Sequence, residues 1–190
     1  MFIFYKYSSK GFTLIELVIS LALAGIILSI ILSILISNIS MFQFNDIDIE
    51  LQQQGQFIIG FLEDKIMGSV GIEYLQDING VVKHETNEKV ILKKIIFKNV
   101  SEAADKGYIF QLSKDPDYNY YNLKYGIGLS GTPTVEVGNF IEKIEVEPIP
   151  LHYPYTEAKG LSLEILFNFG GNMKAFRTQI SFRNHFRRYE

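Results

Sequence analysis

Apolar residues are concentrated in one uninterrupted segment near the N-terminus. Residues 17–37 read LVISLALAGIILSIILSILIS, and about 20 apolar residues are what an α-helix needs to cross the hydrocarbon core of a bilayer. Glu16 is the only ionisable side chain between Gly11 and Asn45, and the segment contains no proline that would break a helix. The pattern predicts one membrane-spanning helix over residues 12–38.

The helical pattern continues beyond the membrane segment. Apolar residues recur at spacings of three, four and seven, with glutamines and acidic residues between them; they are Ile39, Phe42, Ile49, Phe57, Phe61 and Leu62. Gly68 and Gly71 predict that the helix ends near Met67. Residues 39–70 are therefore expected to form an extramembrane half of the same helix, with an apolar face that covers a downstream domain.

After about residue 80 the pattern changes to the two-residue period of β-strands. Runs rich in β-branched and aromatic residues predict strands over 89–99, 107–113, 118–125, 140–147, 161–169 and 173–182. Gly170 and Gly171 separate the last two runs and predict a hairpin. Pro148, Pro150 and Pro154 predict a loop ahead of that hairpin. The expected fold class is α+β, a long N-terminal helix packed on a mainly antiparallel sheet domain over 71–190.

The charges that flank the apolar segment predict its orientation. Lys6 and Lys10 precede it, and the next basic residue is Lys65, which comes after the five acidic residues that follow the apolar segment. Because cytoplasmic flanks of membrane helices are enriched in Lys and Arg, the N-terminus is expected in the cytoplasm and the rest of the chain outside it.

A short motif marks the start of this helix. Residues 10–17 read KGFTLIEL and closely resemble the class III signal of type IV prepilins and pseudopilins. In that family a membrane aspartyl peptidase cuts after the glycine and methylates the new amino terminus. The resemblance implies that residues 1–11 are a cytoplasmic leader, that cleavage falls between Gly11 and Phe12, and that Phe12 becomes N-methylated.

The same resemblance implies partners and a location. The partners are other pilin or pseudopilin subunits, the prepilin peptidase and methyltransferase, and an inner-membrane assembly platform. The protein would be a single-pass protein of the bacterial cytoplasmic membrane, and afterwards part of a filament at the cell envelope or surface.

Glu16 is the residue expected to act in assembly. A lone carboxylate in a membrane span costs a few kcal/mol unless it is paired, and no Lys, Arg or His lies within helical reach. Cleavage would create an amine at Phe12 about one helical turn away, on the same chain or on a neighbouring subunit. The alternative is a glutamate tolerated near a helix end, with its carboxylate at the lipid headgroups.

The order of elements resembles that of J-type minor pseudopilins of type II secretion and of related pilus and competence minor pilins. This resemblance implies a minor subunit that initiates or caps a filament for pilus biogenesis, protein secretion or DNA uptake. The alternative is a single-pass, membrane-anchored binding protein or enzyme that is unrelated to filaments.

The composition limits the chemistry that the chain can perform. Its 190 residues are 47% hydrophobic and carry 18 Lys and Arg against 21 Asp and Glu, a net charge of -3, so no global basic field attracts nucleic acid. The absence of cysteine excludes disulfides and thiolate metal sites. The three histidines lack metal-site spacing, and no GxSxG elbow or phosphate-binding loop occurs. We expect no enzymatic activity, no cofactor and no metal.

Two further patterns have competing interpretations. Asp115, Asp117 and Asn119 have the spacing of calcium-loop oxygens, but the positions that need Gly and Glu hold other residues, which favours an acidic turn around Pro116. Near the C-terminus, basic residues interleave with aromatic ones: Lys174, Phe176, Arg177, Phe182, Arg183, His185, Phe186, Arg187, Arg188 and Tyr189.

This basic and aromatic pattern suits nucleic-acid contact, for which Arg183, Arg187 and Arg188 are the candidates. It suits equally a strand with a solvated basic face and an aromatic row turned to the core, and the acidic overall charge favours that second interpretation.

Overall fold

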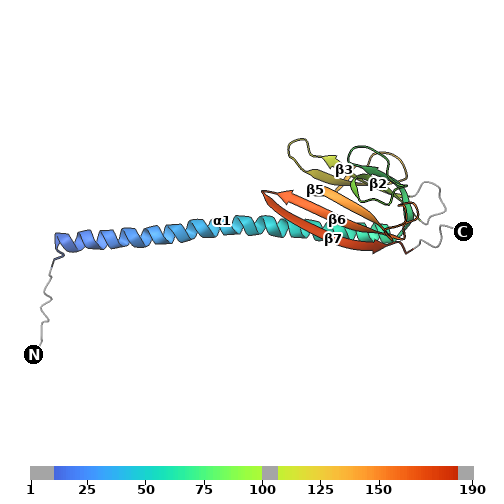
Figure 1. The fold of residues 1–190 in the computed structure, drawn as a ribbon. Coiled ribbons are helices and arrows are strands. Elements are labelled where there is room, and N and C mark those ends of the chain that lie inside the picture. The colour runs from blue at the N-terminus through green and yellow to red at the C-terminus, as the bar shows by residue number, and fades with distance from the viewer. Residues whose placement is uncertain (1–10, 100–106, 184–190) are drawn as a thin grey trace, which may run out of the picture. The chain divides into compact units, whose positions relative to one another are not determined.

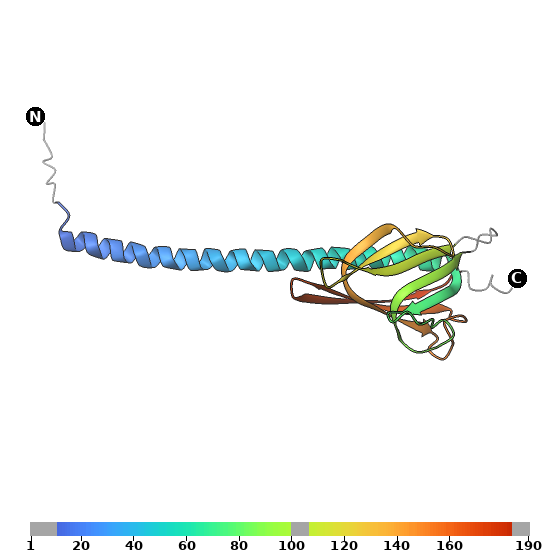
Figure 2. The same ribbon diagram turned by 90° about the horizontal axis from the view of Figure 1, so that it is seen from above.

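The computed structural model describes residues 11–99 and 107–183, in a chain that divides into two compact units, Met1–Asp46 and Ile47–Glu190. One helix, α1 (Leu14–Met67), belongs to both units (Figures 1 and 2). Its bounds confirm the predicted long helix, which ends directly before Gly68 because glycine is a poor helix former and a common helix terminator.

In the first unit, α1 is apolar on all sides. Its most apolar stretch of 18 residues has a mean hydropathy of 2.8, so the helix is long and apolar enough to cross a membrane. The hydroxyl groups of Ser20, Ser29 and Ser33 donate to backbone carbonyls of the preceding turn at 2.7–2.9 Å. These polar groups are therefore satisfied within the helix itself.

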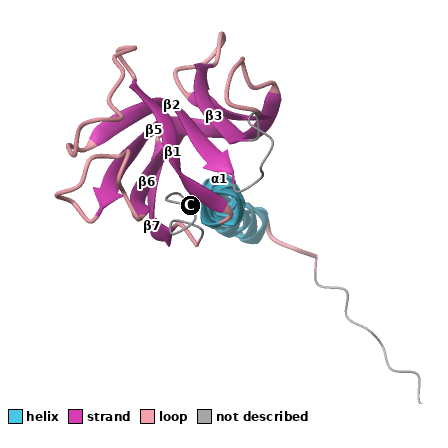
Figure 3. Cartoon of the chain, turned by 90° about the vertical axis from the view of Figure 1, so that its right-hand side faces the viewer, coloured by secondary structure: helices cyan, strands magenta, loops and turns pink. Residues whose placement is uncertain are grey.

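The second unit contains the rest of α1 and one seven-stranded antiparallel sheet. The strands are β1 (Ser69–Asp77), β2 (Val90–Asn99), β3 (Gly107–Lys114), β4 (Tyr121–Ile127), β5 (Val135–Ile149), β6 (Gly160–Phe169) and β7 (Asn172–Ser181). They follow one another in sequence order across the sheet, and β2 also pairs with β5. Figure 3 shows the strands curving around one side of the helix. This arrangement confirms the α+β fold class.

Six of the predicted strands are present, and one strand was missed. β1 begins one residue after the helix-terminating Gly68, and Gly71 interrupts its alternation. The sequence predicts Gly71 at the end of the helix, whereas Gly71 pairs with Lys98 of β2 beside a β-bulge. Because glycine adds no side chain to either face, it removes the two-residue period by which a short strand is recognised.

The loop predicted at the three prolines begins later than expected. Pro148 lies within β5 and pairs with Leu161 of β6, so only Pro150 and Pro154 belong to the loop. On its other side β5 pairs with β2 only as far as Val146. Pro148 therefore occupies a part of β5 with a partner strand on one side, where the missing N–H is tolerated.

The hydrophobic core lies between α1 and the sheet. The helix contributes the buried residues Leu51, Gly55, Ile58, Leu62 and Ile66, at the spacing of one helix face. The predicted apolar face is confirmed at Leu62, which is buried, and is wrong at Ile49 and Phe57, which are 51% and 59% exposed. Gly55 explains the difference: the ring of Phe176 of β7 lies directly against its backbone, a contact that a hydrophobic pattern cannot show.

Two glycines of this helix are expected to respond oppositely to alanine. A Cβ at Gly55 would overlap the Phe176 ring, whereas one at Gly60 meets nothing within 4 Å. Gly55→Ala should therefore lower the free energy of unfolding by about 1–3 kcal/mol, and Gly60→Ala should raise it by about 0.5–1 kcal/mol. Chemical unfolding of the full chain in detergent micelles measures both, and equal effects would contradict this packing.

Candidate functional site

The start of α1 carries a reciprocal set of hydrogen bonds between Thr13 and Glu16. The Thr13 N–H and the Thr13 hydroxyl donate to Oε2 of Glu16 at 2.9 and 2.8 Å. The Glu16 N–H donates back to Oγ1 of Thr13 at 3.4 Å. Thr13 immediately precedes the first helical residue, so this is a capping box of the form Thr-x-x-Glu.

In the uncut chain, the cap supplies the Glu16 carboxylate with hydrogen-bond donors, and neither donor belongs to a basic side chain. The first N–H groups of a helix have no intrahelical acceptor, and a negative charge in the first turn is favoured by the helix dipole. Both bonds from Thr13 end on Oε2, and no donor among the described residues binds Oε1. We missed this cap in the sequence, although the spacing of Thr13 and Glu16 is sufficient to find it.

Gly11 and Phe12 lie in front of the helix rather than in it. Phe12 is 79% exposed, and a Cβ added at Gly11 would meet no atom within 4 Å. The peptide bond between them is therefore held neither by helical hydrogen bonds nor by packing. Lys6 and Lys10, which precede it in the sequence, lie outside the described residues.

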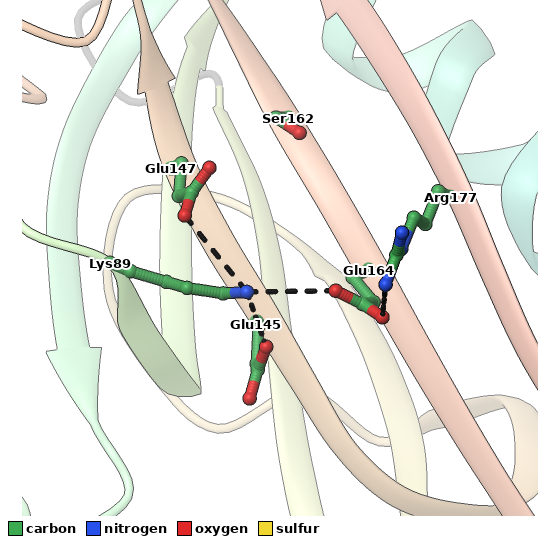
Figure 4. Close-up of a pocket in the computed structure, with 6 residues that line it drawn as sticks. All are labelled: Lys89, Glu145, Glu147, Ser162, Glu164 and Arg177. Atoms are coloured by element: carbon green, nitrogen blue, oxygen red, sulfur yellow. Dashed lines mark hydrogen bonds and ion pairs between the residues drawn. The ribbon is translucent and has the colours of Figure 1, made fainter.

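A polar hollow of the second unit lies on the outer face of the sheet and has a volume of about 310 Å³. It is lined by Lys89, Glu145, Glu147, Ser162, Glu164 and Arg177 (Figure 4). The Lys89 ammonium lies 2.6 Å from Glu145, 3.5 Å from Glu164 and 3.9 Å from Glu147. Arg177 lies 2.7 Å from Glu164, and Lys143 lies 2.6 Å from Glu145.

These side chains act as counter-ions for one another. Hydrogen bonds from Lys143 and Lys89 lower the pKa of Glu145, and the bond from Arg177 lowers the pKa of Glu164. Across the described ranges, no group of three or more His, Asp or Glu side chains has the geometry to hold a metal ion. The hollow is lined by a network of ion pairs on the sheet.

Acid should weaken the fold partly through Glu145. A carboxyl whose folded pKa lies below its ordinary value of 4.5 stabilises the fold above that pH, and its contribution is lost as the pH falls through the folded pKa. Below pH 4.5, the melting temperature of the parent chain should fall more steeply with pH than that of Glu145→Gln. Glu157→Gln, at an exposed loop carboxyl, is the control and should keep the parent's steepness.

Among the described residues near the C-terminus, the basic side chains do not form one solvated face. Lys174 faces α1 and lies 2.8 Å from Asp48, while Arg177 points to the outer face, where it pairs with Glu164. The Arg183 side chain is exposed, and the backbone N–H of Arg183 donates to the backbone carbonyl of Met67. Arg187 and Arg188 lie outside the described residues, as do His185, Phe186 and Tyr189. The aromatic part of the prediction is confirmed by Phe176 and Phe182, which pack on the core.

The acidic turn around Pro116 is confirmed. Oδ1 of Asp115 accepts the N–H groups of Asp117 and Tyr118 at 2.9 and 3.2 Å, which is the hydrogen bonding of an Asx turn. The carboxylate that would be the first calcium ligand is thus used to hold the loop.

Comparison with known proteins identifies the N-terminal region. Residues 6–36 match the family model of the prokaryotic N-terminal methylation motif. Neither the curated proteins nor the solved structures gave a match. The matched residues include the capped helix start and the Gly11–Phe12 bond, and they confirm the resemblance to type IV pilins and pseudopilins. The motif indicates a type IV pilin-like precursor, and the apolar N-terminal helix is consistent with a single-pass inner-membrane anchor.

Proposed function

We propose that this chain is a minor subunit of a type IV pilus-like filament, a structural protein rather than an enzyme. Residues 12–38 would hold it in the bacterial inner membrane, with the leader in the cytoplasm, until it is drawn into the fibre. The observation that carries the proposal is the exposed Gly11–Phe12 bond directly in front of a capped apolar helix, within the matched motif.

The processing step follows from this geometry. A peptidase needs an extended, accessible bond, and a bond in front of the helix meets that need without unwinding any turn. Hydrolysis would release residues 1–11 and leave a free amine on Phe12, which is then methylated. The apolar helix stays attached to the mature chain because the cut falls ahead of it.

The second carboxylate oxygen of Glu16, Oε1, supports a role of this residue in assembly. With Oε2 engaged by Thr13, Oε1 is available to accept a hydrogen bond from the Phe12 amine of a neighbouring subunit. A charge-assisted hydrogen bond of this kind contributes about 1.5–3 kcal/mol, and more of it survives where water is excluded. This pair would favour a subunit whose N-terminal helix enters the bundle of neighbouring helices in the correct register.

The size of the second unit supports a minor rather than a major subunit. A sheet of seven strands offers a large surface for contacts with particular neighbours, as expected of a subunit that initiates or caps a filament. J-type pseudopilins of type II secretion and the minor pilins of pilus and competence systems are the subgroups that we propose.

Processing tests the proposed function directly. The full chain should be purified from membranes of the cells that make it and examined by intact mass and N-terminal sequencing. We expect a chain that begins with N-methylated phenylalanine at position 12. Material that still carries residues 1–11 would overturn the proposal and favour an uncut, anchored protein of another class.

A further inference from the structure

Within the second unit, the side of α1 that faces away from the sheet carries exposed apolar residues. The buried residues of this helix share one face, and Figure 3 shows the strands around that side of α1. At 100° per residue, five exposed positions lie on the opposite face: Ile49, Gln53, Phe57, Gly60 and Asp64. The side chains of Ile49 and Phe57 are more than half exposed. We call these five residues the open stripe.

A hollow of about 360 Å³ lies beside the open stripe. It is lined by Glu50, Gln53, Gln54 and Phe57 of α1 and by Val137 of β5. An aromatic side chain at the wall of an open hollow is the kind of anchor that dominates binding at protein interfaces. The open stripe therefore combines exposed apolar side chains with a concave surface that a partner can fill.

Gly60 gives the open stripe a point of close approach. It lies inside α1, where glycine is a poor residue because of its large backbone entropy. A Cβ at this position would meet no atom within 4 Å, so the packing of this chain does not require a glycine here. The distance between two packed helices depends on the side chains at their contact. A glycine on the outer face therefore favours the close packing of a second helix.

The charges along this face specify which helix can dock. Glu50 lines the hollow, and within the described ranges no basic side chain forms an ion pair with it. Asp64 ends the stripe and pairs with its neighbour Lys65, while the stripe itself contains no basic residue. Two copies that packed stripe to stripe would bring their carboxylates together, which is unfavourable. A helix that carries Lys or Arg would be attracted instead.

We propose that the open stripe docks an α-helix of a different chain, whose apolar face is bordered by Lys or Arg. The apolar face covers Phe57 and packs closely at Gly60, and a basic side chain lies at Glu50. Because a helix rises about 1.5 Å per residue, residues 49–64 span about 22 Å, which a partner helix of about four turns covers. In the proposed filament this partner is a subunit of another kind, and that identification alone rests on the proposed function.

Two synthetic helical peptides test the charge preference. They share one leucine-rich apolar face, which is bordered by lysine in the first and by glutamate in the second. The chain has no cysteine, so Gln53→Cys places a single environment-sensitive dye on the open stripe of the full chain in uncharged detergent micelles. We expect the lysine peptide to shift the dye emission to the blue, and the glutamate peptide to leave it unchanged. The same dye on Gln179→Cys, at an exposed position of β7, should respond to neither peptide.

Gly60→Ala separates docking from folding. The added Cβ fills the point of close approach, so this variant should bind the lysine peptide more weakly than the parent does. Its melting temperature should nevertheless rise, because alanine is the better helix former. A loss of binding through misfolding would lower both quantities together.

Two substitutions beside the hollow test the anchor and the charge. Phe57→Ala should weaken binding of the lysine peptide about tenfold or more, as truncation of an aromatic anchor does. Glu50→Lys should reverse the preference, so that the glutamate peptide binds more tightly than the lysine peptide. Glu157→Lys makes the same charge change at an exposed loop position and should keep the parent's preference.

Three results would contradict the docking proposal. One is an equal response of the dye at position 53 to the two peptides, and another is no response to either. The third is a disulfide between two copies of unlabelled Gln53→Cys that forms more readily than one between two copies of Gln179→Cys. That crosslink would identify a second copy of this chain as the occupant.

Peptide binding and processing are separate measurements, so the two proposals can fail separately. If the purified chain keeps residues 1–11 but its stripe binds the lysine peptide, the proposed function is wrong and the docking surface remains. If the chain is cut at Gly11 but the dye at position 53 does not respond, the docking proposal alone is wrong.

Discussion

Gly11→Val is expected to abolish processing, so that the purified chain keeps residues 1–11. A β-branched side chain at the residue before the scissile bond should not fit where the peptidase accepts glycine. The chain itself has room for this change, because a Cβ at Gly11 meets no atom within 4 Å. A block would therefore arise in the enzyme's binding site and not from misfolding of the substrate. Intact mass of the membrane fraction measures it.

Gly25→Val is the matched control for this experiment. Gly25 also has no atom within 4 Å of an added Cβ, but it lies within α1, well beyond the cut. Its variant should be processed to the same extent as the parent. The uncut Gly11→Val chain should also be missing from filaments, since it has no amine at Phe12. A mature mass for Gly11→Val, equal to the parent mass with the leader removed, would contradict the assigned cleavage point.

Features fixed by local chemistry could be predicted from the sequence. The apolar run and the spacing of the apolar residues after it predicted α1, and Gly68 predicted its end. A helix and its end can be predicted in this way because each depends on residues within one turn of each other. The hairpin at Gly170 and Gly171 was equally local: both glycines have positive φ, 59° and 84°, as the two-residue turn of a hairpin requires. The cleavage motif belongs to the same class, since its residues are neighbours in the chain.

Features set by distant contacts could not be predicted in this way. The buried face of α1 depends on Phe176, which packs on Gly55 from a strand that follows more than a hundred residues later. The alternation of β7 predicts Lys174 on a solvated basic face, whereas its ammonium pairs with Asp48 of α1. The ring contacts of Phe140 with Tyr120 and Phe169 depend on the register of β4, β5 and β6. Alternation within one strand contains no information about such partners.

Glu16→Ala is expected to be inserted and cut normally, yet to be lost from the filament. The substitution removes the carboxylate that would accept a hydrogen bond from the Phe12 amine of a neighbouring subunit. A charge-assisted hydrogen bond contributes about 1.5–3 kcal/mol, which corresponds to an approximately ten- to hundredfold fall in incorporation. The ratio of variant to parent in sheared filaments, measured against the ratio in the membrane, gives this number. Parent-like incorporation of Glu16→Ala would remove the assembly role.

Alanine removes the helix cap and the charge together, so a second substitution is needed to separate them. Glutamine also serves in a capping box, and Glu16→Gln should keep the bonds to Thr13 while losing the negative charge. Thr13→Val does the reverse, because it deletes the hydroxyl and leaves the carboxylate. If pairing with the Phe12 amine drives assembly, Glu16→Gln should fail like Glu16→Ala, and Thr13→Val should retain most incorporation. The opposite ranking would mean that Glu16 acts by ordering the first turn of the helix, and that the amine finds another acceptor.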